Sequence, residues 1–389
     1  MTDPSDFIAI AGADSVTRIL HDRGDAWVDS AVTTGWWPAW RPGRREYAVS
    51  RVEMPRGTAH AALHLQGIDG GDIPIPGSMS TPPALIAERM AHYALWDPTG
   101  RALCYVMPSG RTLAARLWRP GDSEAETLTG GTPIFPSWSP DGRRLVLHYG
   151  DQLMSVDQES GERRQLSANA MGFRTAAISS DGELTAFAEA RTAGTALLCH
   201  REAAAEPTEA ARFDGGVALS FRPGTRELTI AVTTGAEAGV FRDLYLLDMD
   251  RPGEPRRLIH GPMLAYWWAP TGDRLAVLVP AYTGDGRYQL RFHGPDGQFL
   301  RAMEPLTLSP DVRTMVSFFD QFALSHRPWA PDGRRFAFGG RLLTDAIPAS
   351  FADGQLDAVV VADAVAGGPW TRVGWGFAGF YPPREVNGR

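Results

Sequence analysis

The chain contains no lysine: of its 389 residues, 38 are basic, and all of these are arginine. This absence excludes mechanisms that need a lysine amine, such as a lysine-bound pyridoxal cofactor or an aldolase with an amine nucleophile. A phosphate-binding loop of the Gly-x-x-x-x-Gly-Lys type is excluded for the same reason. We attribute the replacement of lysine by arginine to a GC-rich coding bias rather than to a structural purpose.

Cysteine is nearly absent as well, with only Cys104 and Cys199. Two cysteines do not make a zinc site, and their spacing does not suggest a structural disulfide. We expect both to be buried as small apolar side chains in or near strands.

Long apolar runs are also missing, since none reaches the roughly 18 residues that a transmembrane helix requires. The acidic start of the chain, residues 1–6, lacks the basic region and apolar core of a signal peptide. We therefore expect a cytoplasmic protein that does not insert into a membrane. The net charge is −7 and no block of basic residues occurs, so nucleic acid is not an expected partner.

The most regular feature that is present is a short hairpin unit, of which Trp138-Ser-Pro-Asp-Gly142 is the clearest copy. Pro140 fixes φ and cannot donate to a strand ladder, so the strand that contains Trp138 is expected to end there. Asp141-Gly142 is a strong turn signal, because glycine accepts positive φ and aspartate tolerates it. The aliphatic run that follows predicts the next strand.

Seven copies of this unit recur at intervals of 40–61 residues. They are Trp40-Arg-Pro-Gly43, Trp96-Asp-Pro-Thr-Gly100, Trp138-Ser-Pro-Asp-Gly142, Ile178-Ser-Ser-Asp-Gly182, Phe221-Arg-Pro-Gly224, Trp268-Ala-Pro-Thr-Gly272 and Trp329-Ala-Pro-Asp-Gly333. A third strand, such as 152–156, and a short outer strand, such as 163–166, follow the hairpin. A period of roughly 40–50 residues with four short strands is the signature of a β-propeller.

The repeat resembles the TolB-type β-propeller repeat, a relative of tryptophan–aspartate repeats, across nearly all of the chain. The resemblance implies an all-β fold built from four-stranded blades. It carries little information about function, because such propellers serve as scaffolds, binding proteins and enzymes.

We predict one all-β domain over residues 1–389, a seven-bladed β-propeller of four-stranded antiparallel blades. Residues 1–30 precede the first hairpin and contain the strand-like runs 7–10 and 16–20, so we expect this segment to close the ring by pairing with the last blade. The segment 377–383 echoes the strand–proline element. It leaves open an alternative of eight blades, one of them built from both ends of the chain.

Several connections between the predicted strands are long, and the strand order places all of them on one face of the ring. Long loops on a compact scaffold usually carry function. The working site is therefore expected at the mouth of the central channel on that face. The long connections are 53–60, 77–90, 234–242, 280–287, 303–322 and 340–356.

The inner strands should begin at this face, so the residues just before each hairpin anchor are expected around the channel mouth. Aromatic walls with arginine suit a small organic ligand that is aromatic or anionic. The predicted ligand-binding residues are Trp36, Trp37, Tyr93, Arg174, Tyr266, Trp267, Phe318, Phe319 and Arg327.

If the site is catalytic, His326 or His92 is the candidate general acid or base, and Asp320 is the candidate orienting carboxylate. The segment around Phe318 and Phe319 is interpreted as a lid over this polar spot. Such a site supports non-covalent chemistry of the lyase, isomerase, cyclase or hydrolase type.

No hydrolase elbow, dinucleotide-binding loop or metalloprotease motif occurs in the sequence, so no cofactor and no metal site is predicted. Two hypotheses follow. The first is a small-molecule site at the channel mouth, with or without acid–base chemistry. The second is a non-catalytic scaffold that binds another protein through a contiguous apolar patch.

Overall fold

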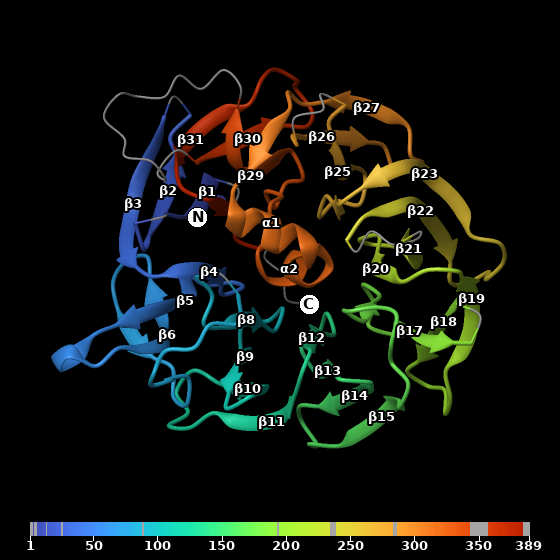
Figure 1. Cartoon of the computed structure of the whole chain (residues 1–389), viewed down its shortest axis with the longest axis horizontal. Coiled ribbons are helices and arrows are strands. Elements are labelled where there is room, and N and C mark those ends of the chain that lie inside the picture. The colour runs from blue at the N-terminus through green and yellow to red at the C-terminus, as the bar shows by residue number, and fades with distance from the viewer. Residues whose placement is uncertain are drawn as a thin grey trace.

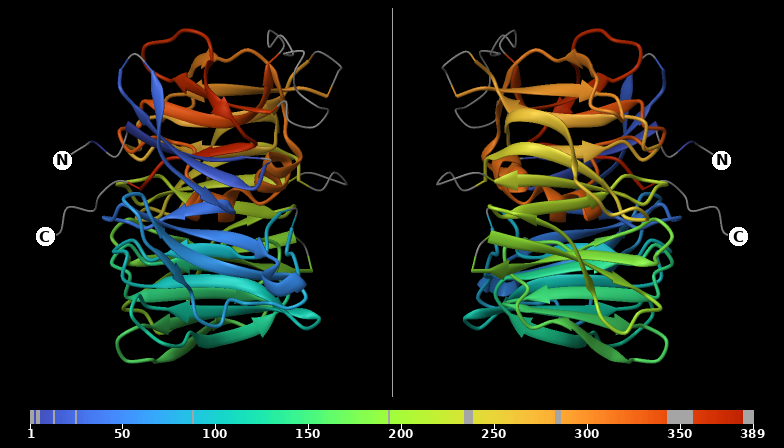
Figure 2. Two further views of the ribbon diagram at one scale, coloured as in Figure 1. Left: turned by 90° about the vertical axis from the view of Figure 1, so that its left-hand side faces the viewer. Right: turned by 90° about the vertical axis from the view of Figure 1, so that its right-hand side faces the viewer.

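The computed structural model describes residues 3, 6–12, 14–24, 26–87, 89–192, 194–233, 239–282, 286–342 and 357–383. Within these residues, antiparallel sheets stand around a common centre like the blades of a β-propeller, and two short helices lie at that centre (Figure 1). Seen from the side, the strands run between the two faces of the ring (Figure 2). The predicted long connections 234–242, 280–287 and 340–356 lie partly outside the described residues.

Both ends of the chain contribute to one sheet, which we call the composite sheet. Its strand order is β3-β2-β1-β32, so the C-terminal strand is innermost and three N-terminal strands lie outside it. Strand β1 pairs with β32 through Ala9–Phe380, Ile10–Gly379 and Ala11–Ala378. The strands are β1 (Phe7–Ala11), β2 (Val16–Asp22), β3 (Trp27–Thr34) and β32 (Ala378–Phe380).

Five further four-stranded sheets follow in chain order, each beginning with its inner strand. The first is β4 (Trp36–Trp40), β5 (Glu46–Glu53), β6 (His60–Gly67) and β7 (Asp72–Pro74), with the short helix η2 (Pro55–Gly57) between β5 and β6. The second and third are β8 (Tyr93–Trp96), β9 (Leu103–Ser109), β10 (Thr112–Trp118) and β11 (Glu126–Gly131), then β12 (Ile134–Trp138), β13 (Arg144–Tyr149), β14 (Gln152–Asp157) and β15 (Arg163–Ser167). The fourth and fifth are β16 (Ala177–Ile178), β17 (Leu184–Arg191), β18 (Gly194–Arg201) and β19 (Thr208–Phe213), then β20 (Val217–Phe221), β21 (Glu227–Thr233), β22 (Phe241–Asp248) and β23 (Arg256–Met263).

The last two hairpin anchors, Trp268 and Trp329, belong to one eight-stranded sheet: Trp268 ends its strand β24, and Trp329 forms an isolated bridge to Phe336 of its strand β29. Its order is β24-β25-β26-β28-β29-β30-β31, and β27 pairs with β26 beside this path. The strands are β24 (Ala265–Trp268), β25 (Leu275–Pro280), β26 (Tyr288–His293), β27 (Phe299–Ala302), β28 (Leu306–Leu308), β29 (Arg335–Leu342), β30 (Ala358–Asp363) and β31 (Thr371–Trp375).

The tryptophans of the hairpin repeat connect neighbouring sheets by hydrogen bonds. In four copies the indole Nε1 donates to a backbone carbonyl of the preceding inner strand, where a buried N–H needs an acceptor. These bonds are Trp40 to Phe380 at 2.9 Å, Trp96 to Ala39 at 3.2 Å, Trp138 to Leu95 at 3.2 Å and Trp329 to Trp267 at 3.0 Å. The repeat in the sequence therefore reflects a repeated contact between sheets.

The seven hairpin glycines all have positive φ, and some of them are needed for space as well. Gly100 and Gly272 both have φ of +71°, and a Cβ at either position would collide with a carbonyl oxygen of the preceding turn, that of Pro42 or Pro223. The hairpin turns therefore pack against one another around the ring.

The connection between β28 and β29 forms two helices, α1 (Pro310–Ser317) and α2 (Phe319–Ser325), which we call the central helices. Ser309 caps the N-terminus of α1: its hydroxyl accepts a hydrogen bond from the Val312 N–H, and Pro310 is the first helical residue. In the described part of the chain neither these nor any other helix has the length and apolar character that a bilayer span needs.

Both cysteines are buried and unpaired, as the sequence predicts. Burial raises the pKa of the Cys104 thiol to about 12, so this side chain is an inert part of the core.

Candidate functional site

The central helices occupy the place where the sequence predicts an open channel mouth. Helix α2 contacts the inner strands β8, β12, β20 and β24, which belong to four different sheets. Most of the predicted site residues therefore lie in α2 or pack close to it instead of lining an open entrance.

Gln321 fastens α2 to the inner strands. Its amide nitrogen donates to the hydroxyl of Tyr93 at 2.5 Å and to the carbonyl of Pro136 at 3.1 Å. Its amide oxygen accepts a hydrogen bond from the Thr175 hydroxyl at 3.0 Å, and its own carbonyl accepts one from Tyr93. Sequence reasoning missed Gln321, because a single polar residue in an apolar helix gives no signal of its partners.

The predicted residues Arg174 and Asp320 form an ion pair beside this contact. Arg174 lies in the connection between β15 and β16, and its Nε donates to Asp320 Oδ1 at 2.9 Å. The Asp320 side chain is only 1% exposed, whereas that of Arg174 is 24% exposed. Among the described residues, the two Nη groups of Arg174 and the Oδ2 atom of Asp320 have no hydrogen-bond partner.

Two aromatic rings lie next to the guanidinium of Arg174. The Arg174 guanidinium carbon lies 5.7 Å from the centre of the Phe318 ring, and that ring lies 6.3 Å from the ring of Phe135 in β12. Phe318 is the residue between the two helices and is 40% exposed. The Arg174 guanidinium and the exposed Phe318 ring thus lie side by side at the surface.

The backbone that carries Arg174 is held in place by His148 of β13. The two ring nitrogens of His148 lie 2.6 Å from the Arg174 carbonyl oxygen and 2.7 Å from that of Ala170. The imidazole stacks on Phe173 at a centroid distance of 4.5 Å. This segment is therefore ordered before any ligand arrives.

His326, a predicted acid or base, is buried and engaged within the fold. The Ser325 hydroxyl lies 2.7 Å from its Nδ1, and the Trp37 carbonyl lies 3.4 Å from its Nε2. The rings of Trp37 and Phe380 pack against it at 5.6 and 4.8 Å. Burial lowers the pKa of His326 to about 4, so the imidazole is neutral near neutral pH.

His92, the other predicted acid or base, lies elsewhere and is equally enclosed. Its ring nitrogens lie 3.2 Å from the Ser50 hydroxyl and 2.7 Å from the Ser78 carbonyl. Burial lowers its pKa to about 4 as well. The structure therefore pairs Asp320 with Arg174, and it does not bring Asp320 into contact with either histidine as an orienting carboxylate.

The other predicted aromatic residues form the packing around the helices. Phe319 is buried against Tyr266 and Trp267, at centroid distances of 5.0 and 6.1 Å. Trp37 is buried and has φ of +56°, a strained value for a residue with a side chain, while Trp36 is partly buried.

Arg327 lies just beyond α2 and is partly buried. Its carbonyl accepts a hydrogen bond from the Tyr381 N–H at 2.9 Å, but its guanidinium has no partner in the described parts of the chain. Burial lowers its pKa to about 10, so it remains charged near neutral pH.

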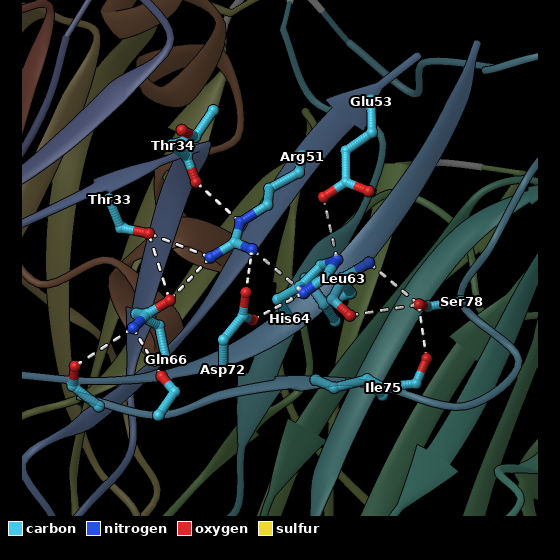
Figure 3. A network of polar contacts seen from close by, with 12 residues as sticks. Thr33, Thr34, Arg51, Glu53, Leu63, His64, Gln66, Asp72, Ile75 and Ser78 are labelled. Atoms are coloured by element: carbon cyan, nitrogen blue, oxygen red, sulfur yellow. Dashed lines mark hydrogen bonds and ion pairs between the residues drawn. The ribbon is translucent and has the colours of Figure 1, made fainter. Parts of the chain in front are cut away.

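A polar network that the sequence did not indicate joins the composite sheet to the next sheet (Figure 3). Arg51 of β5 is its centre. Its Nε donates to the Thr34 carbonyl at 2.9 Å, and its Nη2 donates to the Thr33 hydroxyl at 3.0 Å and to Gln66 at 2.7 Å. The guanidinium thus joins β3 to β5 and β6.

Two carboxylates complete the network. Asp72 accepts hydrogen bonds from Arg51 at 2.5 Å and from His64 at 2.8 Å, and Glu53 faces His64 and His60 at 3.5 and 3.3 Å. Burial alone would raise the pKa of Asp72, but the hydrogen bonds from Arg51 and His64 hold it below its ordinary value. No group of three such side chains in the described residues is arranged to hold a metal ion. We interpret the network as a structural tie between sheets.

Comparisons with known proteins identify the type of fold but no family. No family model matches the chain, and no curated protein matches it. Among solved structures, dihydro-heme d1 dehydrogenase NirN in complex with DHE is 11% identical and covers 98% of this chain and 76% of its own, with a TM-score of 0.62. A eukaryotic initiation factor is 10% identical, with 98% and 99% covered and a TM-score of 0.56. An oligogalacturonate lyase in complex with manganese is 15% identical, with 85% and 86% covered and a TM-score of 0.52.

At these identities the similarity establishes a β-propeller type of fold and nothing about activity. The neighbours include propellers that were solved with a bound ligand or metal.

Proposed function

We propose that the protein binds a small organic anion with an aromatic body, at a surface site formed by Arg174, Phe318 and Phe135. The observation that carries the proposal is that only one nitrogen of the Arg174 guanidinium is hydrogen-bonded within the described residues. Its Nε is fixed by a carboxylate that is almost fully buried, while both Nη groups have no partner among the described residues. A guanidinium held in this way presents a preorganised fork to a carboxylate or phosphate.

The neighbouring rings supply the apolar part of the site. Phe318 is 40% exposed and lies beside both the guanidinium and Phe135. An aromatic ligand stacked there would remove apolar surface from water while its anionic group reaches Arg174.

Binding without acid–base catalysis is the function that this geometry favours. The two candidate acid–base histidines, His92 and His326, have a lowered pKa of about 4, and both ring nitrogens of each contact neighbouring atoms of the fold. A general acid or base works best with a pKa near the working pH and with a free proton-accepting atom.

The scaffold alternative needs a contiguous apolar patch, and we do not favour it. The exposed large apolar side chains among the described residues come from outer strands and connections of different sheets. They are Val28, Val32, Met54, Ile73, Met79, Leu85, Met171, Tyr282, Phe299, Leu300, Phe318 and Val365.

We further infer that the ring has eight blades. Seven would begin with the seven hairpin anchors, of which Trp268 and Trp329 share the eight-stranded sheet, and the composite sheet would be the eighth. In this proposal the TolB-type repeat remains a resemblance at the level of the blade.

Calorimetric titration of the full chain with 3-phenylpropionate tests the proposed function. We expect measurable binding that Arg174→Gln weakens by about tenfold or more, since a charged hydrogen bond to the ligand is lost. Arg313→Gln, which changes an exposed arginine on α1, is the matched control and should leave the affinity unchanged. Absence of binding, or equal affinity in both variants, would contradict the proposal.

A further inference from the structure

The Asp320 carboxylate uses only one of its two oxygens. Oδ1 accepts the hydrogen bond from Arg174 Nε, whereas Oδ2 is buried and has no partner in the described part of the molecule. A carboxylate and a guanidinium often pair side by side through two hydrogen bonds, and here only one is formed. Leaving a buried acceptor without a partner costs about 1–3 kcal/mol, so such an atom requires an explanation.

The Oδ2 atom of Asp320 lies close to the Arg174 guanidinium, whose two Nη groups also lack a partner among the described residues. The two oxygens of a carboxylate are bonded to the same carbon, so Oδ2 cannot be far from the guanidinium that contacts Oδ1 at 2.9 Å. The region therefore offers two kinds of unused polar group, the donors of Arg174 and the acceptor of Asp320. A ligand that satisfies both carries an anionic group and, next to it, a hydrogen-bond donor.

We propose that the preferred ligand is an aromatic acid with a hydrogen-bond donor on the carbon beside its carboxylate, as in an aromatic α-hydroxy acid. This inference rests on the proposed function of the Arg174 site. The carboxylate binds the Nη groups of Arg174, the α-hydroxyl donates to Asp320 Oδ2, and the aromatic ring packs on Phe318 and Phe135.

Phe318 lies beside the ion pair at the surface. Its ring lies beside the guanidinium and is 40% exposed, so one side of it is not packed against protein. It stands between α1 and α2 with φ of −125° and ψ of 36°, outside both helical segments. The proposed binding mode requires the Phe318 side chain to turn outward, so that the ligand hydroxyl can reach Asp320 Oδ2.

Neighbouring groups hold the pair in a fixed position. Gln321, the next residue in α2, is bonded to Tyr93 and Thr175, and the carbonyl of Arg174 contacts His148. These contacts hold the Asp320 carboxylate and the Arg174 guanidinium in place. The site can therefore discriminate between ligands by the position of their hydrogen-bond donor.

The experiment compares 3-phenyllactate with 3-phenylpropionate, which differ only in the α-hydroxyl, by calorimetric titration of the unaltered full chain. We expect phenyllactate to bind about tenfold more tightly or better, since a hydrogen bond to a charged group is gained. In Asp320→Asn the preference should disappear while phenylpropionate still binds. The amide oxygen can still accept from Arg174, so the ligand hydroxyl then meets a neutral amide nitrogen, and a neutral hydrogen bond adds far less affinity than one to a charged carboxylate.

Asp311→Asn is the matched control, because Asp311 is a buried carboxylate of α1 that pairs with Arg89 at 2.7 Å. It should retain the preference for phenyllactate. Equal affinities of the two acids in the unaltered protein, with binding that still depends on Arg174, would overturn this inference alone and assign the Oδ2 partner to a water molecule. Binding of neither acid would overturn the proposed function as well.

Discussion

At the scale of single residues, the two candidate acid–base histidines serve the fold. His92 and His326 are buried, and each has both ring nitrogens in contact with a hydroxyl or a carbonyl. The sequence predicted both at the channel mouth but could not show which way their rings point. A one-residue change in strand register would reverse that direction.

These two histidines make stability depend on pH. Their folded pKa of about 4 lies below the ordinary value of 6.5, so between these values the unfolded chain binds protons that the folded chain does not. The stabilisation is therefore complete above pH 6.5 and is lost as the pH falls toward 4. Each histidine contributes on the order of 3 kcal/mol across that window.

Urea denaturation at a series of pH values from about 7 to about 4.5 measures this dependence. In His92→Gln the free energy of unfolding should fall less steeply with decreasing pH than in the unaltered chain. Ser317→Ala, at an exposed position of α1 that carries no titratable group, should leave the slope nearly unchanged. A slope that is identical in all three proteins would contradict the burial of a neutral His92.

At the scale of elements, the decisive feature is the pair of central helices. The sequence predicts the segment 303–322 as a long connection with a lid around Phe318 and Phe319. The structure folds its second half into α1 and α2, with Phe319 buried and Phe318 exposed. Helices of 8 and 7 residues are too short to be stable alone, so packing against the inner strands stabilises them.

Gln321→Ala tests this dependence on packing. It removes the amide that contacts Tyr93, Pro136 and Thr175 and leaves buried polar groups without a partner. We expect the free energy of unfolding in urea to fall by about 2–3 kcal/mol. Ser317→Ala, at an exposed position of α1, should change it by less than about 0.5 kcal/mol. Similar values for the two variants would show that Gln321 does not hold the helices.

At the scale of the whole molecule, the two ends of the chain stabilise one another. Strand β1 pairs with β32, Trp40 donates to the Phe380 carbonyl, and Arg51 joins β3 to the next sheet. Pairing of residues so far apart in sequence is entropically costly until the intervening sheets are in place.

A cysteine pair at Ala11 and Ala378, which lie opposite each other in β1 and β32, tests this pairing. Once oxidised, this crosslink should raise the free energy of unfolding by about 3–5 kcal/mol, because it restricts the unfolded chain over a very long loop. The gain should vanish when the bond is reduced, and the single variant Ala378→Cys should show none. A failure to form the bond would contradict the register between the strands. A bond that forms without stabilising the protein would contradict closure by these strands.

The repeated hairpin unit follows from the order of the amino acids alone. Tryptophan, proline and glycine at fixed spacing specify a strand, a stop and a turn wherever they occur, because these preferences are local. The sequence also brought Arg174, Asp320 and Phe318 into one predicted region. The pairing of Asp320 with Arg174 instead of a histidine emerged only from the folded chain, as did the choice between the two predicted ways of joining the chain ends. Those outcomes depend on contacts between residues distant in sequence, and no local preference encodes them.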